Sequence, residues 1–197
     1  EMCIRDRQHF FLERTHSQIV RLSDLIRDIA LITKTEEASE LFDKEQVNVH
    51  NTLQEVINDL HSPIVAHGIN VKNEINPQTV IEGNKTLVYA IFRNLIENSI
   101  NYAGDHISIG VNNYMEDKEF YYFSYYDTGQ GIEENHLNRI FERFYRVCEG
   151  RSRQNGGSGL GLSIVKNAVL FHKGDISAKN RKDGGLEFLF SLKKTLF

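Results

Sequence analysis

Apolar residues recur at helical spacing in the first part of the chain, where residues 8–34 contain neither proline nor glycine. Leu12, Ile19 and Ile26 stand seven residues apart, and other apolar residues interleave with them. The pattern predicts a long amphipathic helix whose stripe resembles a helix-bundle or coiled-coil seam. Because one helix cannot bury such a stripe alone, we expect a partner helix or a second chain. An ordinary core helix of the same domain is the alternative.

The pattern changes after this helix. Residues 36–46 are acidic and polar, and we expect them to link residues 1–35 to a second domain at residues 47–197. In that domain, apolar runs and alternation predict strands at residues 47–49, 69–75, 80–81, 106–111, 120–126, 175–179 and 186–192. Helical spacing predicts helices that start at Asn51 or Thr52, at Asn84 and at Ser158.

Two residues should end or interrupt the first of these helices. Pro63 should bend or break it, and Gly68 should stop it. Helices and hairpins are mixed along residues 47–197, which favours an α+β fold. We therefore expect a two-layer sandwich, in which helices cover one face of a mixed β-sheet, preceded by the long helix.

Bulk composition excludes several classes of protein. The chain has 197 residues, of which 40% are hydrophobic and 25% charged, as is usual for globular proteins. A net charge of −4 argues against nonspecific nucleic-acid binding. The cysteines, Cys3 and Cys148, indicate a reducing compartment rather than a disulfide framework. No apolar run approaches the ~20 residues of a membrane span, and the abrupt start suggests a piece of a longer protein.

Two asparagines on the predicted helix are candidates for ligand binding. Asn94 and Asn98 stand four residues apart and therefore share one helical face. An amide offers one acceptor and two donors, so it can hold a metal or a polar ligand edge without adding charge. A surface or capping role is the alternative for such a pair.

A carboxylate and two glycines follow the aromatic strand. Asp127 precedes Gly129 and Gly131. A buried carboxylate there can accept a hydrogen bond from an exocyclic amine, such as that of adenine, and the glycines allow close approach and positive φ. The alternative is a simple turn at the end of a strand.

A glycine-rich stretch, Gly-Gly-Ser-Gly-Leu-Gly-Leu at residues 156–162, opens into a predicted helix. Free N–H groups and the helix dipole at such a start favour a phosphate. The stretch lacks the Gly-Lys-Ser/Thr of a P-loop, and a hinge without ligand is the alternative. Before it, residues 131–157 form a long charged segment of the kind that often serves as a lid, with candidate phosphate-binding arginines at Arg139, Arg143, Arg146, Arg151 and Arg153.

Four blocks, residues 93–102, 127–131, 140–146 and 156–162, together resemble the N, G1, F and G2 boxes of the ATP-binding domain of sensor histidine kinases. The resemblance extends from about Arg14 to the C-terminus. It implies ATP and Mg²⁺ as cofactors, and phosphoryl transfer to a histidine for relay to a response regulator. It also implies that residues 1–35 are the second helix of a dimerisation hairpin, in the cytoplasmic portion of a membrane-bound sensor.

The resemblance also implies a role for each matching residue. Asp127 would recognise adenine beside Gly129 and Gly131, with Tyr102 against the base. Asn98 would coordinate Mg²⁺, while Asn94 and Arg146 would act at the phosphate end. The remaining matches are Phe141 and Phe144, which would anchor the lid, and the phosphate-binding residues Gly157, Ser158, Gly159, Leu160, Gly161 and Leu162.

Three further observations bear on this interpretation. Many family members have lysine where this chain has Asn101, and losing that charge could weaken nucleotide binding. Related hydrolysing enzymes have a glutamate base where this chain has Asn94, which favours phosphoryl transfer over hydrolysis. No His-Glu-x-x-x-Pro-like acceptor motif is present, because His16 is followed by Ser17 and no proline comes soon after it. We therefore expect that this chain does not autophosphorylate. The alternatives to a histidine kinase are a degenerate nucleotide- or partner-binding module and a serine kinase.

Overall fold

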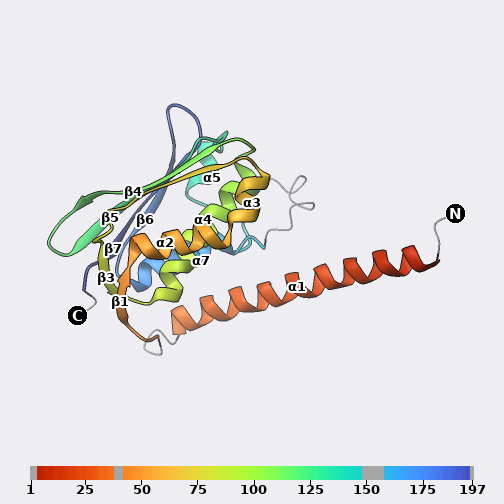
Figure 1. Cartoon of the computed structure of the whole chain (residues 1–197). Coiled ribbons are helices and arrows are strands. Elements are labelled where there is room, and N and C mark those ends of the chain that lie inside the picture. Colours follow the sequence, from red (N-terminus) through yellow and green to blue (C-terminus); the bar gives the residue numbers. More distant parts are fainter. Residues whose placement is uncertain (1–3, 38–41, 148–157, 196–197) are drawn as a thin grey trace.

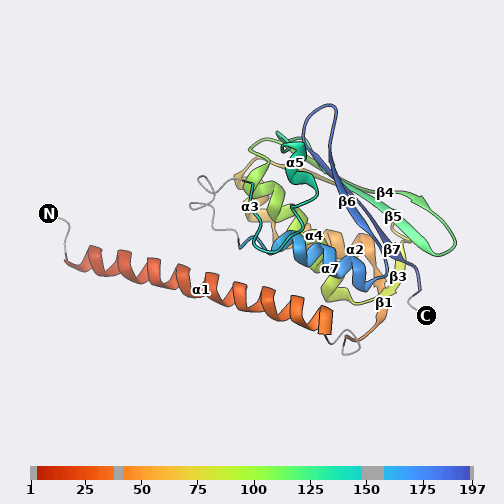
Figure 2. The same ribbon diagram turned by 180° about the vertical axis from the view of Figure 1, so that it is seen from behind.

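A computed structural model describes residues 4–37, 42–147 and 158–195 of the chain (Figure 1). Helix α1 (Ile4–Glu37) extends the predicted long helix at both ends. It projects from a compact body that contains the strands, and the first turns of α1 lie far from that body (Figures 1 and 2). No helix among the described residues is both long and apolar enough to cross a membrane.

The body is built on one mixed five-stranded sheet with the strand order β2-β4-β5-β7-β6. Strands β2 and β4 are parallel, and the other neighbouring pairs are antiparallel. A separate antiparallel pair, β1–β3, lies beside it. The strands are β1 (Glu45–Asn48), β2 (Asn70–Glu74), β3 (Val80–Gly83), β4 (Ser108–Glu116), β5 (Phe120–Asp127), β6 (Ile176–Asn180) and β7 (Leu186–Lys193).

Helices cover one face of this sheet, so the predicted α+β sandwich is confirmed (Figures 1 and 2). The core between the layers includes the fully buried Phe92 and Leu95 from helix α4 and Phe123 and Phe188 from the sheet. Burial of this apolar surface is the main favourable contribution to folding. The helices of the body are α2 (Val49–Asp59), α3 (His61–Ala66), α4 (Lys85–Tyr102), the short α5 (Glu134–Leu137) and α7 (Gly161–Phe171).

Side-chain caps define where the helices begin. The Asn84 side chain accepts a hydrogen bond from the Leu87 N–H (3.1 Å), as expected for the start of α4. The predicted start of α2 at Asn51 or Thr52 is wrong. The Asn48 side chain accepts from the Asn51 N–H (2.9 Å), so the cap lies earlier and α2 begins at Val49.

The predicted interruption at Pro63 is confirmed, because α2 ends at Asp59 and α3 starts at His61. Proline has no N–H to donate to the carbonyl four residues earlier, which prevents one continuous helix. Gly68 then ends α3. Its N–H donates to the Val65 carbonyl and the next N–H to the Ile64 carbonyl, a hydrogen-bond pair typical of helix C-termini.

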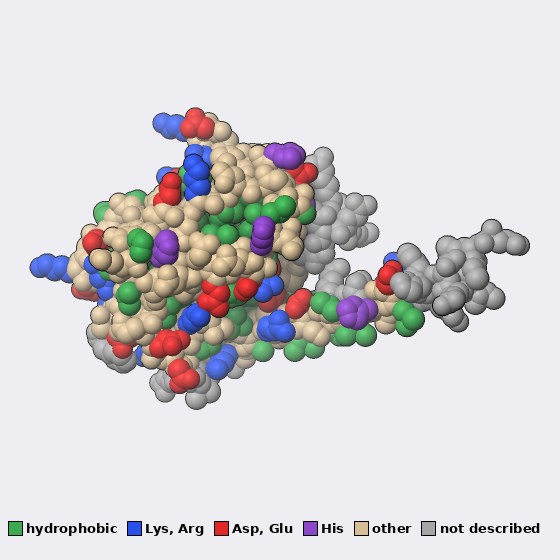
Figure 3. Space-filling view, viewed as in Figure 1, with side chains coloured by type: hydrophobic (Ala, Val, Ile, Leu, Met, Phe, Trp, Pro, Cys, Tyr) green, Lys and Arg blue, Asp and Glu red, His purple; other side chains and the backbone are tan. Residues whose placement is uncertain are grey.

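Among the described side chains of α1, those that pack against the body lie toward its C-terminal end. Ile32 is 4% exposed and forms a small apolar cluster with Ala90, Leu160 and Ile164 from α4 and the start of α7. Leu12, Ile19 and Ile26 are more than half exposed, and hydrophobic side chains line the projecting helix (Figure 3). The end of α1 that carries Ile32 therefore packs as a core helix of the body, and for the exposed stripe the partner helix or second chain stays a prediction. Phe42, inside the expected linker, is buried in the main core.

Candidate functional site

Asp127 ends β5 and is almost completely buried, with 3% of its surface exposed. One carboxylate oxygen, Oδ1, accepts hydrogen bonds from the N–H groups of Gly129 (2.9 Å) and Leu186 (3.3 Å). The other oxygen, Oδ2, accepts from the Ser99 hydroxyl (3.1 Å). Charge-assisted bonds of this kind hold a carboxylate in one orientation as an acceptor. The arrangement suits recognition of a ligand N–H group.

Behind Asp127 lies a buried hydroxyl pair that sequence reasoning missed. The Ser99 hydroxyl of α4 lies 2.9 Å from the Tyr125 hydroxyl, which donates to the Leu95 carbonyl (3.0 Å). Burial raises the pKa of Tyr125 well above its usual value, so its phenol stays protonated. A signal was present, because Ser99 follows Leu95 by one helical turn and is a polar residue in an apolar stripe.

Both glycines after Asp127 are required by close packing. A Cβ at Gly129 would lie 2.5 Å from the Ala103 carbonyl oxygen, at the end of α4. Gly131 has φ +68°, and its Cβ would meet the Asn180 amide oxygen at 2.7 Å. The Asn180 side chain accepts from the Ile132 N–H (3.0 Å) and donates to the Ile132 carbonyl (2.6 Å). Strand β6 thereby fixes the turn, a contact that the sequence did not reveal.

The two asparagines predicted for the phosphate end differ in their surroundings. The Asn94 amide donates to the Ala90 carbonyl (2.8 Å), and its oxygen faces Gly161, where an added Cβ would lie 2.8 Å away. Asn94 therefore connects α4 to the start of α7. Asn98 is partly exposed, and its side chain makes no hydrogen bond within the described part of the chain. Its amide oxygen is open to a ligand.

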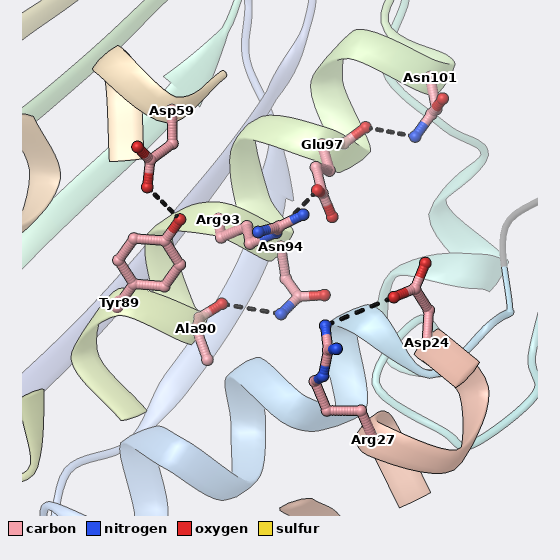
Figure 4. Close-up of polar contacts among 9 residues, drawn as sticks. All are labelled: Asp24, Arg27, Asp59, Tyr89, Ala90, Arg93, Asn94, Glu97 and Asn101. Carbon is pink, nitrogen blue, oxygen red and sulfur yellow. Dashed lines mark hydrogen bonds and ion pairs between the residues drawn. The ribbon is translucent and has the colours of Figure 1, made fainter. Parts of the chain in front are cut away.

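Other polar groups on α4 pair with each other (Figure 4). The Arg93 guanidinium contacts the Glu97 carboxylate (2.9 Å), and the Asn101 amide donates to the Glu97 carbonyl (2.7 Å). Asn101, which stands where a lysine was expected, thus makes a bond within the helix. Tyr102, at the end of α4, is 44% exposed, so its ring has free surface for a ligand.

The glycine-rich stretch enters the described structure at Ser158, so Gly157 lies outside the described residues. Helix α7 begins at Gly161, and the predicted start at Ser158 is wrong. The Ser158 hydroxyl accepts from the Leu160 N–H (3.2 Å), and Gly159 has φ +74°. These residues therefore form a turn in front of the helix. Leu160 is buried and Leu162 packs on the main core.

Helix α1 reaches this turn through a contact not expected from the sequence. The Ser158 hydroxyl donates to the Asp28 carboxylate (3.4 Å). The pKa of Asp28 is raised, mainly because the group is half-buried, and the charges of Asp24 and Glu97 add to the shift against the lowering effect of Ser158. Asp24 itself pairs with Arg27 at 3.5 Å (Figure 4). Negative charge thus gathers beside the glycine-rich turn.

The predicted lid is attached to the body by one of its two phenylalanines. The Phe141 ring packs edge-on against Phe188 (centroids 6.2 Å apart) and joins the main core. Phe144 does not anchor through its ring, which is 62% exposed. Instead, with φ +62°, it directs its N–H to the Gly159 carbonyl (2.9 Å). Its backbone therefore connects the lid to the glycine-rich turn.

Several lid residues contact one another rather than facing open space. His136 Nδ1 lies 2.5 Å from the Tyr145 hydroxyl, and the Arg139 guanidinium lies over the Tyr145 ring at 4.3 Å. Arg139 also contacts Glu142 at 3.3 Å. Arg146 is partly buried, whereas the candidate arginines Arg151 and Arg153 lie outside the described residues.

Helix α4 brings the predicted groups into one site. Ser99 and Asn94 both lie on α4, where Ser99 contacts Asp127 and Asn94 contacts the start of α7. These two positions are separated by about 7–8 Å along the helix axis, at 1.5 Å per residue. The buried Asp127 carboxylate and the glycine-rich start of α7 are thus held at neighbouring points along α4.

Comparisons with known proteins identify the family. The sequence profile of the histidine kinase-, DNA gyrase B- and HSP90-like ATPases matches residues 83–196, more than half of the chain. The chain belongs to this family. Within it, the chain is similar to sensor histidine kinases, and it carries their catalytic ATP-binding domain preceded by a helix.

Individual relatives agree with the family assignment. The phosphate regulon sensor protein PhoR of Pseudomonas aeruginosa is 29% identical over 90% of this chain and 40% of its own length. The sensor histidine kinase WalK of Bacillus subtilis is 30% identical over 92% of this chain and 30% of its own length. The chain therefore spans less than half of these curated relatives.

A solved structure shares the fold. The catalytic domain of the histidine kinase ThkA has a TM-score of 0.68 at 25% identity, covering 78% of this chain and 97% of that domain. ThkA is also solved in complex with the response regulator protein TrrA. The match to that structure covers 94% of this chain and 51% of the matched chain, with a TM-score of 0.72 at 22% identity.

Proposed function

We propose that this chain binds ATP with Mg²⁺ and transfers the γ-phosphoryl group to a histidine on a dimerisation helix, from which an aspartate of a response regulator receives it. The observation that carries this proposal is the position of α4, which contacts the amine-binding carboxylate Asp127 and the glycine-rich start of α7. A nucleotide has the matching chemistry, with an amine on the base and anionic oxygens at the other end.

At the base end, Asp127 accepts a hydrogen bond from the 6-amino group of adenine. Its two oxygens are already oriented by Gly129, Leu186 and Ser99. Tyr102 supplies an exposed aromatic face at the end of α4. Gly129 and Gly131 let the chain turn away from the base without a side chain in between.

At the phosphate end, the turn before α7 offers backbone N–H groups, and the dipole of α7 favours anionic oxygens. Among the described residues, no group of three or more His, Cys, Asp or Glu side chains could hold a metal ion. The neutral Asn98 amide oxygen fits Mg²⁺ as a single protein ligand when phosphate oxygens complete the set. Bound Mg²⁺ would neutralise charge on the triphosphate, and Arg146 of the lid would support the γ-phosphate.

Transfer to a protein acceptor is favoured over hydrolysis. An amide is a poor general base, and the Asn94 amide is already engaged with Ala90 and packed against Gly161. Its proposed role is to hold the start of α7 in place. An in-line transfer depends chiefly on such positioning and on charge neutralisation.

Three further parts of the proposal concern the protein around this domain. The exposed stripe of α1, with Leu12, Ile19 and Ile26, would pack in a homodimer through a dimerisation hairpin made by residues 1–35 and an acceptor helix. Residues 36–46 would link this hairpin to the catalytic domain at residues 47–197. The ThkA–TrrA complex supports a response regulator as the partner. The need for ATP supports a cytoplasmic location.

Calorimetric titration with ATP, with and without Mg²⁺, tests the binding step. We expect binding that Mg²⁺ strengthens, and a loss of the Mg²⁺ effect in Asn98→Ala. Phosphoryl transfer is tested with labelled ATP on this chain alone and on this chain mixed with a dimerisation segment that contains the acceptor histidine. We expect acid-labile phosphate on the segment and none on this chain. Labelling of His16 would contradict that part of the proposal.

A nonenzymatic module is the second candidate, and Asn101 favours it. Where a lysine would reach a phosphate, the Asn101 amide donates to the Glu97 carbonyl of its own helix (2.7 Å). Such a module would bind the nucleotide yet label no acceptor. Asn101→Lys separates the two candidates, because an active kinase should gain nucleotide affinity and transfer rate together.

A further inference from the structure

Three buried polar side chains form a chain of short contacts from α4 to the base-binding carboxylate. Tyr125 is 0% exposed, Ser99 1% and Asp127 3%. The Tyr125 and Ser99 hydroxyl oxygens are 2.9 Å apart, and Ser99 is 3.1 Å from Asp127 Oδ2. Buried polar groups are costly unless they are paired, so a network placed here at the end of a strand needs a reason.

The number of protons decides the direction of these bonds. A carboxylate can only accept, so the one Ser99 proton goes to Asp127 Oδ2. The lone pairs of Ser99 then face the Tyr125 hydroxyl, whose proton is shared between Ser99 and the Leu95 carbonyl. The Tyr125 phenol remains a donor because burial raises its pKa. Tyr125 therefore holds Ser99, and Ser99 holds Asp127.

The other oxygen of Asp127 is held by the backbone. Oδ1 accepts from the N–H groups of Gly129 and Leu186, and the Arg181 guanidinium contacts the Asp127 main-chain carbonyl at 3.2 Å rather than the carboxylate. Ser99 is thus the only side-chain donor to the carboxylate within the described residues. Without Ser99, Oδ2 would lose the contact that fixes its direction.

We propose that Ser99 and Tyr125 are positioning residues that make Asp127 specific for a 6-amino purine and against a 6-oxo purine. This inference rests on the proposed function, because it assumes that Asp127 contacts the base. A 6-amino group donates to a fixed acceptor. A 6-oxo group places a second acceptor against it, so the ligand carbonyl finds no donor there and the two oxygens repel each other.

The network makes a prediction that general structural support does not. Ser99→Ala removes the donor that orients Oδ2, so only a ligand that uses Oδ2 should lose affinity. ATP has the amine, ITP has a carbonyl in its place, and purine riboside triphosphate has neither. A merely structural serine would affect all three nucleotides to the same extent.

The test is a set of calorimetric titrations of the whole chain with these three nucleotides in the presence of Mg²⁺. For Ser99→Ala we expect ATP affinity to fall about tenfold, the scale of one hydrogen bond to a charged group, while the affinities for ITP and purine riboside triphosphate change less than about twofold. Tyr125→Phe should lower the ratio of ATP affinity to ITP affinity by a smaller factor, because the Ser99 hydroxyl remains. Ser99→Thr should keep the ratio, because it keeps the hydroxyl.

Ser191→Ala is the matched control. Ser191 is also buried, and its hydroxyl accepts from the Asp175 N–H (3.1 Å), away from Asp127. It should leave the ratio of ATP to ITP affinity unchanged. Thermal unfolding of each variant shows whether it is folded. If Ser99→Ala does not fold, the nucleotide affinities of Tyr125→Phe decide the question.

Two outcomes overturn the inference in different ways. If the unaltered chain binds no ATP, or binds it as well after Asp127→Asn, then the proposed function and the inference both fail. If ATP binding depends on Asp127, yet Ser99→Ala and Tyr125→Phe leave the ATP to ITP ratio intact, the inference alone fails.

Discussion

The proposed base end and the proposed phosphate end of the site are built in different ways, although both contact α4. At the base end, Asp127 is 3% exposed and accepts three hydrogen bonds from groups in the core. At the phosphate end, Ser158 is bonded to Asp28 of another helix, and the Phe144 ring of the lid is 62% exposed. The Asp127 side of the site is thus held by the core, whereas the groups of the proposed phosphate end also contact α1 and the lid.

The two ends of helix α7 also differ in their surroundings. Its first residue, Gly161, packs against Asn94 at the phosphate end. Its last turn ends at His172, which is 0% exposed, donates from Nδ1 to the Ala168 carbonyl (2.7 Å) and accepts at Nε2 from the Asn84 N–H (3.2 Å). One end of the helix is therefore held in the core by His172, and the other lies at the proposed phosphate end.

The strongest test of the comparison is Asp127→Asn. An amide keeps only one acceptor oxygen, so its NH2 group would face either the ligand amine or the backbone N–H groups that need an acceptor. We expect ATP affinity to fall about 100-fold, or ~3 kcal/mol, in calorimetric titrations. Equal heats for variant and parent would show that the base end is not the part that binds.

Acid should destabilise the locked end of α7. Burial lowers the pKa of His172 to about 4, whereas the unfolded value is about 6.5, so the unfolded chain binds more protons between these pH values. The full contribution is present above pH ~6.5 and is lost as the pH falls toward 4, up to about 3 kcal/mol. Urea unfolding at a series of pH values measures this loss. His172→Gln should flatten the dependence; an unchanged slope in that variant would exclude His172 as the cause.

Truncating Ile32 should release α1 from the phosphate end. Ile32 is 4% exposed against Leu160 and Ile164, and Ile→Ala at a buried position costs about 2 kcal/mol or more. We expect faster hydrogen exchange in the last turns of α1, with the β-sheet unaffected. Ile19→Ala, on the exposed part of the same helix, is the control and should change exchange little. Similar exchange in the two variants would mean that the contact with the body does not hold α1.

The smallest effect is expected from Asp28→Asn. Removing a carboxylate beside Ser158 lessens repulsion of phosphate oxygens, so ATP affinity should rise about two- to fivefold. The increase should shrink at high salt, because partly exposed charges are screened. Asp24→Asn is the control, since that side chain is 59% exposed and pairs with Arg27. A decrease in affinity would indicate that Asp28 supports the phosphate end.

Features that depend on neighbours in sequence were predicted well. The Asn84 cap, the break at Pro63 and the stop at Gly68 were predictable because the groups that make them lie within a few residues of one another. Two starts were misplaced by a few residues for equally local reasons. The Asn48 cap competed with Asn51, and the turn at Ser158 delays α7 until Gly161.

The site was predicted only as separate blocks. The resemblance gave roles to Asp127 and Asn94, but it gave none to Ser99, Asn180 and Asp28. Each contacts a group far away in the sequence, as Ser158 does across 130 residues to reach Asp28. Phe144 shows the limit of the resemblance, which implied an anchoring role for a ring that the structure leaves 62% exposed.

By itself, the sequence determined the elements, their approximate limits and the chemistry of the blocks, since hydrophobic spacing and capping act over short stretches. Only the tertiary structure decided that a serine and a tyrosine stand behind the carboxylate, and that one end of α1 lies on the glycine-rich turn. The physical reason is that these contacts depend on how whole elements pack, and packing joins residues that no local pattern relates.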